Sequence, residues 1–173
     1  MAIDIPLLTA QAKAGDTEAF GALYEYHAGD MYRYALYVLG SQCAAQDAVQ
    51  EAALAAFRSI HSLRDPTSFR PWLFRILANR CKRQLRSKYA PPEESLDEQF
   101  AEPASSDAPL GCALELRQAI AALPQAERDV VFLSVLEGYD SGEIGRILGL
   151  RPGTVRSKLS RALAKLRKEN FLS

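Results

Sequence analysis

The stretch SGEIGRILGLRPGTVRSKLSRALAKLRK, residues 141–168, constrains the fold of this chain more than any other. Gly149 fits the left-handed cap that ends a first helix, and Pro152 suits the first turn of a second. In the second helix, apolar residues recur at the spacing of one buried stripe: Val155, Leu159, Ala162, Leu163 and Leu166. Two short helices around a tight turn, a helix-turn-helix, are therefore predicted.

The outer surface of the second helix is strongly basic. Residues 144–168 contain eight Lys or Arg and no Asp or Glu. The buried stripe leaves short hydroxyls and basic side chains outside it: Thr154, Arg156, Ser157, Lys158, Ser160, Arg161 and Lys168. Short side chains allow close approach to a major groove, where arginine can read guanine edges. The pattern favours duplex DNA binding over the alternative, a solvated basic helix on an ordinary bundle.

Charge alternates in blocks along the chain, although 21 Lys or Arg balance 21 Asp or Glu overall. Residues 1–57 carry seven acids and two bases, whereas residues 70–88 carry seven bases and no acid. Residues 91–109 carry six acids and no base. Such blocks indicate a protein that meets more than one kind of surface.

Helical periodicity is widespread and strand signals are scarce, so the predicted fold class is all-α with two small helical domains. One or two helices are expected over residues 16–39, and single helices over about 44–60, 71–88, 112–123 and 124–136. Residues 89–111 hold four prolines and the six acids, a composition typical of a flexible linker. The predicted boundaries are a first domain at 1–89, an acidic linker at 90–111 and a second domain at 112–173.

The helix expected near residues 44–60 separates its two faces at about 100° per residue. Its predicted buried stripe consists of Val49, Ala53, Ala56, Phe57 and Ile60. The opposite side carries Asp47, Gln50, Glu51, Leu54 and Arg58. A leucine ringed by carboxylates and an amide suits a docking site for a basic partner, with Leu54 as the apolar anchor. Ordinary surface polarity with a stray leucine is the alternative.

The helix expected near residues 71–88 has an apolar side and a basic side. Its predicted buried side consists of Leu73, Phe74, Leu77, Cys81 and Leu85. The other side carries an aromatic residue and a row of polar and basic residues: Trp72, Arg75, Asn79, Lys82, Arg83 and Arg86. An aromatic ring beside guanidinium groups suits unstacked bases and a phosphate backbone. A solvated basic face with a packed tryptophan is the alternative.

Neither a catalytic, a cofactor nor a metal site is predicted. His27 and His61 have no nearby cysteine or serine-centred motif, and no histidine shares the face of Asp47 and Glu51. The three cysteines are far apart, which suggests reduced thiols. A secretion leader and an apolar run of about 20 residues are both missing from the sequence, so a soluble cytoplasmic protein without membrane insertion is expected.

These segments together resemble the sigma-70 family, specifically its small extracytoplasmic-function sigma factors. AFGALYEYH, QDAVQEAALAAF and FRPWLFRILANRCKRQLR are similar to successive parts of the sigma-2 region. ALPQAERDVVFLSVLEGYDSGEIGRILGLRPGTVRSKLSRALAKLR is similar to the sigma-4 region. The chain departs from the pattern at Arg83, where relatives often carry an acid, and at Gly145, where alanine is usual. Gly142 and Gly145 each cost about 1 kcal/mol relative to alanine within a helix.

The resemblance implies a dissociable subunit of bacterial RNA polymerase that directs promoter recognition and transcription initiation and is not an enzyme. It implies that Asp47, Gln50 and Glu51 dock on the coiled coil of the polymerase's largest subunit, which agrees with the docking site inferred above around Leu54. Residues 61–70 and the helix from Trp72 to Arg86 would melt the minus-ten element and capture its single strand. The minus-thirty-five duplex would be read by Arg156, Ser157, Ser160 and Arg161. The linker would thread towards the polymerase active site, and an anti-sigma factor is implied as a further partner.

One rival interpretation is a two-domain transcription regulator that uses residues 112–173 for DNA and residues 1–90 to sense a signal or dimerise. Such a regulator would footprint promoter duplex without polymerase. The segment from Asp47 to Glu51 and the strand-capture helix favour the sigma factor instead.

Overall fold

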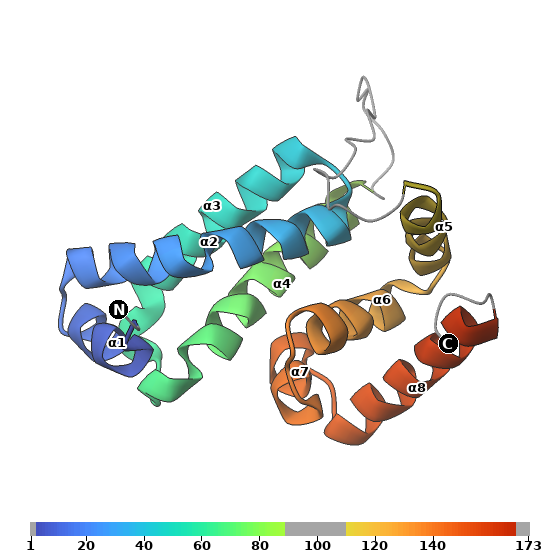
Figure 1. The fold of residues 1–173 in the computed structure, drawn as a ribbon. Helices are drawn as coiled ribbons and strands as arrows, with labels where there is room; N and C mark the ends of the chain where they lie inside the picture. The colour runs from blue at the N-terminus through green and yellow to red at the C-terminus, as the bar shows by residue number, and fades with distance from the viewer. Residues whose placement is uncertain (1–2, 89–109, 169–173) are drawn as a thin grey trace. The chain divides into compact units, whose positions relative to one another are not determined.

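The computed structural model describes residues 3–88 and 110–168, and every regular element in these ranges is helical. The chain divides into two compact units, one within residues 1–101 and one within residues 102–173 (Figure 1). The predicted all-α fold with two helical domains is confirmed. The acidic linker expected at 90–111 lies outside the described residues, apart from the two residues that begin the helix at Leu110.

The first unit begins with a helix that the sequence analysis did not predict. The elements of this unit are α1 (Ile5–Lys13), α2 (Thr17–Leu39), α3 (Gln42–Ser59), η1 (Ile60–Ser62), η2 (Pro66–Ser68) and α4 (Phe69–Lys88). The Asp4 carboxylate accepts a hydrogen bond from the Leu7 backbone N–H at 3.0 Å and so caps α1, with Pro6 in the first turn. An aspartate followed within two residues by a proline is a start signal for a helix, so the sequence held the information for α1.

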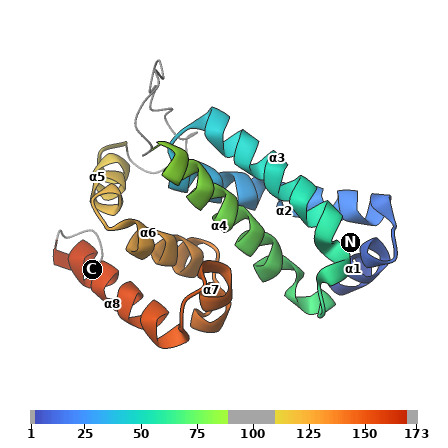
Figure 2. The ribbon, with the colours of Figure 1, turned by 180° about the vertical axis from the view of Figure 1, so that it is seen from behind.

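The three long helices of the first unit pack against one another, and α1 packs on α2, η1 and η2 (Figures 1 and 2). The side of α3 that faces α2 and α4 is lined by small residues, namely Ala45, Ala48, Val49, Ala52 and Ala56. Small side chains at a helix contact allow the helix axes to approach closely. Larger side chains from α2 and α4 fill the remaining core, as in the edge-to-face pair of Tyr34 and Phe74 at 5.9 Å.

The second unit is built around its last and longest helix. Its elements are α5 (Leu110–Ala121), α6 (Gln125–Val131), η3 (Phe132–Leu136), α7 (Ser141–Leu148) and α8 (Pro152–Lys168). Its core includes a cluster formed by Ala119, Leu123, Val131, Ala162 and Leu166. Because this cluster draws on α5, α6 and α8, it holds the back of α8 and leaves the other side of that helix to solvent.

The helix predicted over residues 124–136 is α-helical only as far as Val131. From Phe132 to Leu136 it continues as a π-helical segment, in which the Glu137 N–H donates to the Phe132 carbonyl at 3.2 Å. Within this segment, Val135 is 59% exposed and Leu136 is 65% exposed. Sequence periodicity does not distinguish a π turn from an α turn over five residues.

The turn between α7 and α8 follows the predicted cap chemistry. Gly149 ends α7 with a φ of 70°, and Pro152 is the first residue of α8. Gly145, interpreted above as a weak point of α7, has a steric role instead. A Cβ atom at this position would lie 2.5 Å from the Leu150 carbonyl oxygen, which is backbone. Glycine at this position therefore lets the turn lie close against α7.

None of the described helices is long and apolar enough to span a bilayer.

Candidate nucleic-acid interface

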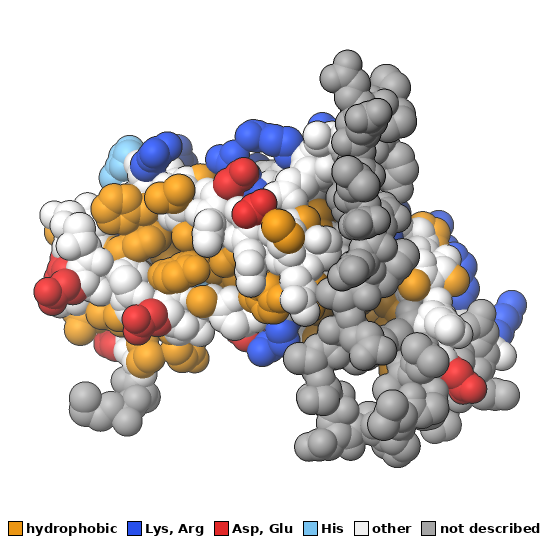
Figure 3. All heavy atoms as spheres, turned by 90° about the horizontal axis from the view of Figure 1, so that it is seen from above, with side chains coloured by type: hydrophobic (Ala, Val, Ile, Leu, Met, Phe, Trp, Pro, Cys, Tyr) orange, Lys and Arg blue, Asp and Glu red, His pale blue; other side chains and the backbone are white. Residues whose placement is uncertain are grey.

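The docking face is the name used here for Asp47, Gln50, Glu51 and Leu54 on α3. All four side chains are exposed, as predicted, and Leu54 is 56% exposed. Figure 3 shows hydrophobic side chains gathered over the face that α2 and α3 form, with acidic side chains beside them. An apolar side chain at the centre of a polar ring is the arrangement that anchors protein interfaces.

Phe57 does not belong to the buried stripe predicted for α3. It is 46% exposed, and its ring meets the ring of Phe20 edge-on at 5.1 Å. The reason is that α3 lies against both α2 and α4, so the alanine side of the helix faces the core and Phe57 lies at its margin. Ala53 is likewise half-buried. Phe57 follows Leu54 by three positions and thus extends the apolar part of the docking face.

An arginine from α4 reaches the docking face. This contact was not predicted from the sequence. Arg80 Nη1 lies 4.0 Å from Glu51 Oε2, and Arg80 is the less exposed partner. An ion pair at this distance with an exposed carboxylate contributes little to stability. The main effect of the pair is on charge. Arg80 partly neutralises Glu51, so Asp47, one turn earlier on α3, carries more of the negative charge of the docking face.

The basic face of α4 is the name used here for Trp72, Arg75, Asn79, Lys82, Arg83 and Arg86. The five polar and basic side chains of this set are exposed, as predicted. Trp72 is half-buried, and its ring lies 5.9 Å from the ring of Phe69. On the opposite side Leu73, Phe74, Leu77 and Cys81 are buried, whereas Leu85 is half-buried in the last turns. The exposed row from Arg75 to Arg86 extends roughly 16 Å along the helix.

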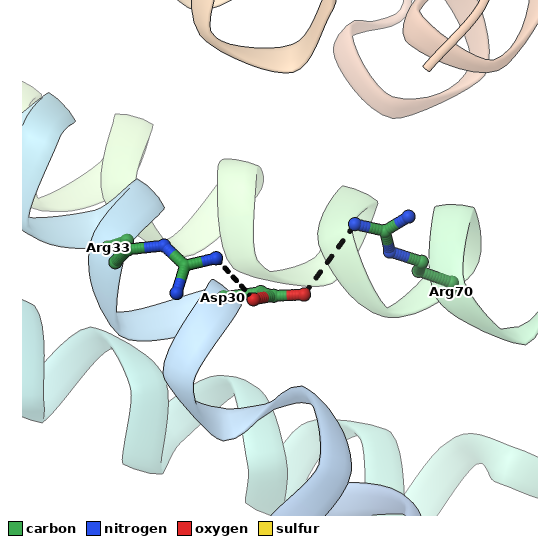
Figure 4. A network of polar contacts seen from close by, with 3 residues as sticks. All are labelled: Asp30, Arg33 and Arg70. Atoms are coloured by element: carbon green, nitrogen blue, oxygen red, sulfur yellow. Dashed lines mark hydrogen bonds and ion pairs between the residues drawn. The ribbon is translucent and has the colours of Figure 1, made fainter. Parts of the chain in front are cut away.

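Arg70, at the start of α4, binds to α2 and lies apart from the exposed row. Figure 4 shows Asp30 between two guanidinium groups, with Arg33 at 2.5 Å and Arg70 at 3.6 Å. The Arg70 guanidinium also lies 5.9 Å from the centre of the Phe74 ring. These contacts fix the point where the loop after α3 enters α4.

His27 lies in the interior next to this junction. It is 1% exposed, and neither ring nitrogen has a hydrogen-bond partner among the described residues. Its ring contacts Tyr26 at 4.9 Å and Phe69 at 5.6 Å. Burial, with a smaller contribution from the Arg70 charge, lowers the pKa of His27 to about 4, and Asp30 opposes the shift. The imidazole is therefore neutral in the folded protein at neutral pH.

The loop before α4 is held by its own short contacts. The Asp65 carboxylate accepts from the Thr67 N–H at 2.9 Å and from the Ser68 hydroxyl at 3.1 Å. Leu63 is buried beside it. An aspartate that caps the following turn in this way gives the loop a defined shape, which suits a surface that must present backbone and side chains in one arrangement.

The recognition face is the name used here for Thr154, Arg156, Ser157, Lys158, Ser160 and Arg161 on α8. Arg156, Ser157, Ser160 and Arg161 are exposed, and Thr154 and Lys158 are half-buried. The predicted stripe on the other side is buried at Val155, Ala162 and Leu166 and half-buried at Leu159 and Leu163. The helix thus presents hydroxyl and guanidinium groups outward, as the sequence pattern predicts.

Two contacts that connect α8 to the rest of the second unit were not foreseen. Lys165 Nζ lies 2.9 Å from the carboxylate of Glu127, which is 6% exposed, and this pair joins α8 to α6. Arg156 Nη1 donates to the Ser141 hydroxyl on α7 at 3.3 Å. Both pairs are far apart in sequence, and only the packing of the helices brings their members together.

The residues described here contain no group of three or more His, Cys, Asp or Glu side chains placed to hold a metal ion. The chemistry that the three faces offer is suited to recognition: an apolar anchor among acids on α3, a basic row with an aromatic residue on α4, and hydroxyls with arginines on α8.

Two segments of the chain match known families. Residues 23–90 match the family described as Sigma-70 region 2, and residues 113–166 match Sigma-70, region 4. The chain is 34% identical to the ECF RNA polymerase sigma factor SigM of Mycobacterium tuberculosis, over 94% of this chain and 82% of that protein. The chain belongs to the extracytoplasmic-function sigma factors of the sigma-70 family. Sigma factors are transcription initiation factors, and the resemblance stated from the sequence is confirmed.

Further relatives of this sigma factor agree in sequence and in fold. It is 29% identical to the ECF RNA polymerase sigma factor SigW of Bacillus subtilis, over 92% of each chain. Its fold is similar to that of CnrH, solved in complex with the cytosolic domain of CnrY, with a TM-score of 0.71, 24% identity and 95% of each chain covered. It is also similar to the sigma factor RpoE of Bartonella quintana, solved with the anti-sigma factor NepR, with a TM-score of 0.70, 22% identity and coverage of 88% and 96%.

Proposed function

We propose that this sigma factor joins core RNA polymerase through its first unit and reads promoter DNA through both units. The proposed organisation is docking and minus-ten recognition at 1–89, an acidic linker at 90–111 and minus-thirty-five recognition at 112–173. The observation that supports it is the distribution of charge: each compact unit exposes one basic helix face, while an acidic face with an exposed leucine lies on a different helix, α3. Three faces of different chemistry suit three different partners.

The docking face suits a basic surface of the polymerase. Leu54, 56% exposed, would enter an apolar site, and Asp47 would pair with a cation at its margin. Because Arg80 already lies 4.0 Å from Glu51, Asp47 is the better single acid to test. The exposed part of Phe57 would add apolar contact area next to Leu54.

The basic face of α4 suits the melted strand of the minus-ten element. Its exposed row from Arg75 to Arg86 is long enough to follow several nucleotides of a phosphate backbone. Unstacking a base costs a few kcal/mol, so capture of the strand must be offset by contacts elsewhere in the polymerase. Trp72, half-buried and packed on Phe69, would contribute the exposed part of its ring at the end of this row.

The recognition face of α8 suits the major groove of the minus-thirty-five duplex. Arg156 and Arg161 can each donate two hydrogen bonds to one guanine, and Ser157 and Ser160 are short enough to let the helix approach the base edges. The buried stripe on the other side of α8 holds the helix on the unit while this face meets DNA.

An anti-sigma factor is proposed as a further partner, and this proposal is supported by the sigma factor RpoE, which has a similar fold and was solved with the anti-sigma factor NepR. The proposed role places the protein in the cytoplasm, where transcription takes place, and assigns it no catalytic activity of its own.

The experiment that tests the function is in vitro transcription with core polymerase on a promoter library with both elements randomised. The wild-type chain should confer initiation on a subset of templates that share two elements. Leu54→Glu should reduce polymerase association by more than about tenfold, because a charge replaces the apolar anchor that docking would bury. The matched control is Leu7→Glu on α1, where the leucine is 54% exposed but lies outside the docking face. Asp47→Ala should also weaken association.

Arg161→Ala should change the preference at one minus-thirty-five base pair by about 1–3 kcal/mol. Its control, Arg167→Ala, removes an exposed charge from the last turn of the same helix and should weaken binding evenly across templates. Failure of the chain to bind core polymerase or to start transcription on any template would contradict the proposal. A footprint on promoter duplex without polymerase, together with no initiation, would instead support a two-domain transcription regulator.

A further inference from the structure

The side chain of Arg156 extends from α8 to the start of α7. Its Nη1 atom donates to the hydroxyl of Ser141 at 3.3 Å, across 15 residues of sequence. Arg156 is exposed and Ser141 is half-buried, so the hydroxyl belongs to a better-held part of the unit than the guanidinium does. The long Arg156 side chain on the recognition face is thus hydrogen-bonded to α7, the first helix of the helix-turn-helix.

The position of Ser141 is set by the cap of α7. Asp140 accepts from the Glu143 N–H at 2.8 Å, and the Glu143 carboxylate accepts from the Asp140 N–H at 2.9 Å. This reciprocal capping box fixes the backbone of the first turn. Ser141 is the first residue of that turn. Because its backbone is fixed, its hydroxyl can occupy only the staggered positions about the single Cα–Cβ bond.

The Arg156 guanidinium lies next to Gly153 in the first turn of α8. A Cβ atom at Gly153 would lie 3.8 Å from Arg156 Nη2, which is ordinary van der Waals contact. Side chains on a helix lean towards its N-terminus, so the guanidinium lies over the first turn of α8. One of the five N–H donors of the guanidinium is bonded to Ser141. Two adjacent donors therefore remain for the O6 and N7 acceptors of guanine.

We propose that Ser141 is a positioning residue for base reading, because its hydroxyl orients the Arg156 guanidinium before DNA binds. A residue of the first helix of the motif thereby contributes to the base preference of the second. The inference rests on the proposed function, in which α8 reads the minus-thirty-five duplex. Without the hydroxyl, the long arginine side chain samples more rotamers, and some of them place the guanidinium on phosphate or on the neighbouring base pair.

The test uses the full-length chain with core polymerase and a promoter library randomised in the minus-thirty-five element. Four variants are compared with wild type: Ser141→Ala, Ser141→Thr, Arg156→Ala and the double variant Ser141→Ala with Arg156→Ala. Ser141→Ala should reduce discrimination at one base pair by about three- to tenfold, the range for one hydrogen bond. The affected base pair should be the one at which Arg156→Ala loses its preference.

Three readouts separate positioning from a general structural role. Ser141→Thr keeps the hydroxyl and should restore the preference. The change Ser141→Ala should have no further effect in the Arg156→Ala background, since the two residues act through one contact. The dependence of binding on salt concentration should stay the same in Ser141→Ala, because no phosphate contact is lost. Circular dichroism of each variant verifies that the helices are intact.

An even loss of activity across all templates in Ser141→Ala, or an effect that persists without Arg156, would overturn the inference and indicate a direct phosphate contact by Ser141. If Arg156→Ala alters one base preference while Ser141→Ala alters none, the inference fails and the proposed function of α8 stands. If Arg156→Ala leaves the preference at every position unchanged, the role of Arg156 in base reading fails and the inference fails with it.

Discussion

The buried histidine of the first unit makes the stability of that unit depend on pH. His27 is 1% exposed, has no hydrogen-bond partner for either nitrogen among the described residues, and lies near the Arg70 guanidinium. Burial and the nearby charge lower its pKa from 6.5 to about 4. The unfolded chain binds a proton near pH 6.5, whereas the folded chain excludes it until about pH 4. Acidification through this window therefore favours unfolding.

The size of the effect follows from the two pKa values. Each pKa unit corresponds to about 1.4 kcal/mol, so a fall from 6.5 to about 4 removes about 3 kcal/mol of unfolding free energy once the pH has passed through the window. Most carboxylates stay ionised above pH 5.5. Between pH 7.5 and pH 5.5 the loss from His27 alone is about 1.3 kcal/mol.

The assay is urea unfolding from pH 7.5 to pH 5.5, followed by the fluorescence of Trp72. The chain has a single tryptophan, and it lies in the first unit beside Phe69, so its signal reports the unit that holds His27. The comparison variant is His27→Leu, which removes the titrating group and keeps a similar volume. His61→Gln is the matched control, because His61 is exposed and is the other histidine of the chain.

Wild type and His61→Gln should lose stability on acidification, and His27→Leu should lose about 1.3 kcal/mol less. Carboxylates present in all three proteins cancel in this comparison. Equal pH dependence in wild type and His27→Leu would refute the reasoning. An NMR titration in which the His27 ring signals move near pH 6.5 in the folded protein would refute it as well.

Two further predictions concern a close backbone contact at Gly145 and the ion pair of Lys165 with Glu127. Gly145→Ala should lower the unfolding free energy of the second unit by about 1 kcal/mol or more although alanine favours helices, because its Cβ would lie 2.5 Å from the Leu150 carbonyl oxygen. The control is Gly29→Ala on α2, where a Cβ meets nothing within 4 Å. This variant should raise the unfolding free energy of the first unit by up to about 1 kcal/mol. Thermal unfolding by circular dichroism measures both, and a gain in Gly145→Ala would contradict the steric role. Lys165→Met should cost about 1–2 kcal/mol by leaving the buried Glu127 carboxylate without its cation, and adding Glu127→Gln should recover most of that loss in urea unfolding. No recovery in the double variant would show that the pair is not the cause.

Much of α8 and of the turn before it could be predicted because the signals are local. A left-handed glycine at Gly149, a proline at Pro152 and an apolar stripe at a period of 3.6 residues depend only on neighbours within a turn or two. The same reasoning placed Leu54 on the exposed side of α3 and Arg75 on the exposed side of α4. Each of these residues lies on the side of its helix that the period assigned to it.

Other features could not be predicted, because they depend on which helix a side chain meets. Phe57 follows the helical period of an inward residue, yet it is 46% exposed because α3 turns its alanines to α2 and α4. Gly145 resembles a weak helical residue until the approach of the Leu150 backbone is known. The pairs of Arg80 with Glu51 and of Arg156 with Ser141 join different helices and leave no spacing pattern in the sequence.

The amino-acid sequence by itself determined most of the α-helices, the cap at Gly149, the order of the two sigma-factor regions and the acidic or basic character of each exposed face, since all of these depend on residues close together along the chain. Tertiary structure alone decided the burial of His27, the ion pair of Arg80 with Glu51 and the hydrogen bond from Arg156 to Ser141. These depend on distances between helices, and such distances arise from the packing of whole faces rather than from any local run of residues.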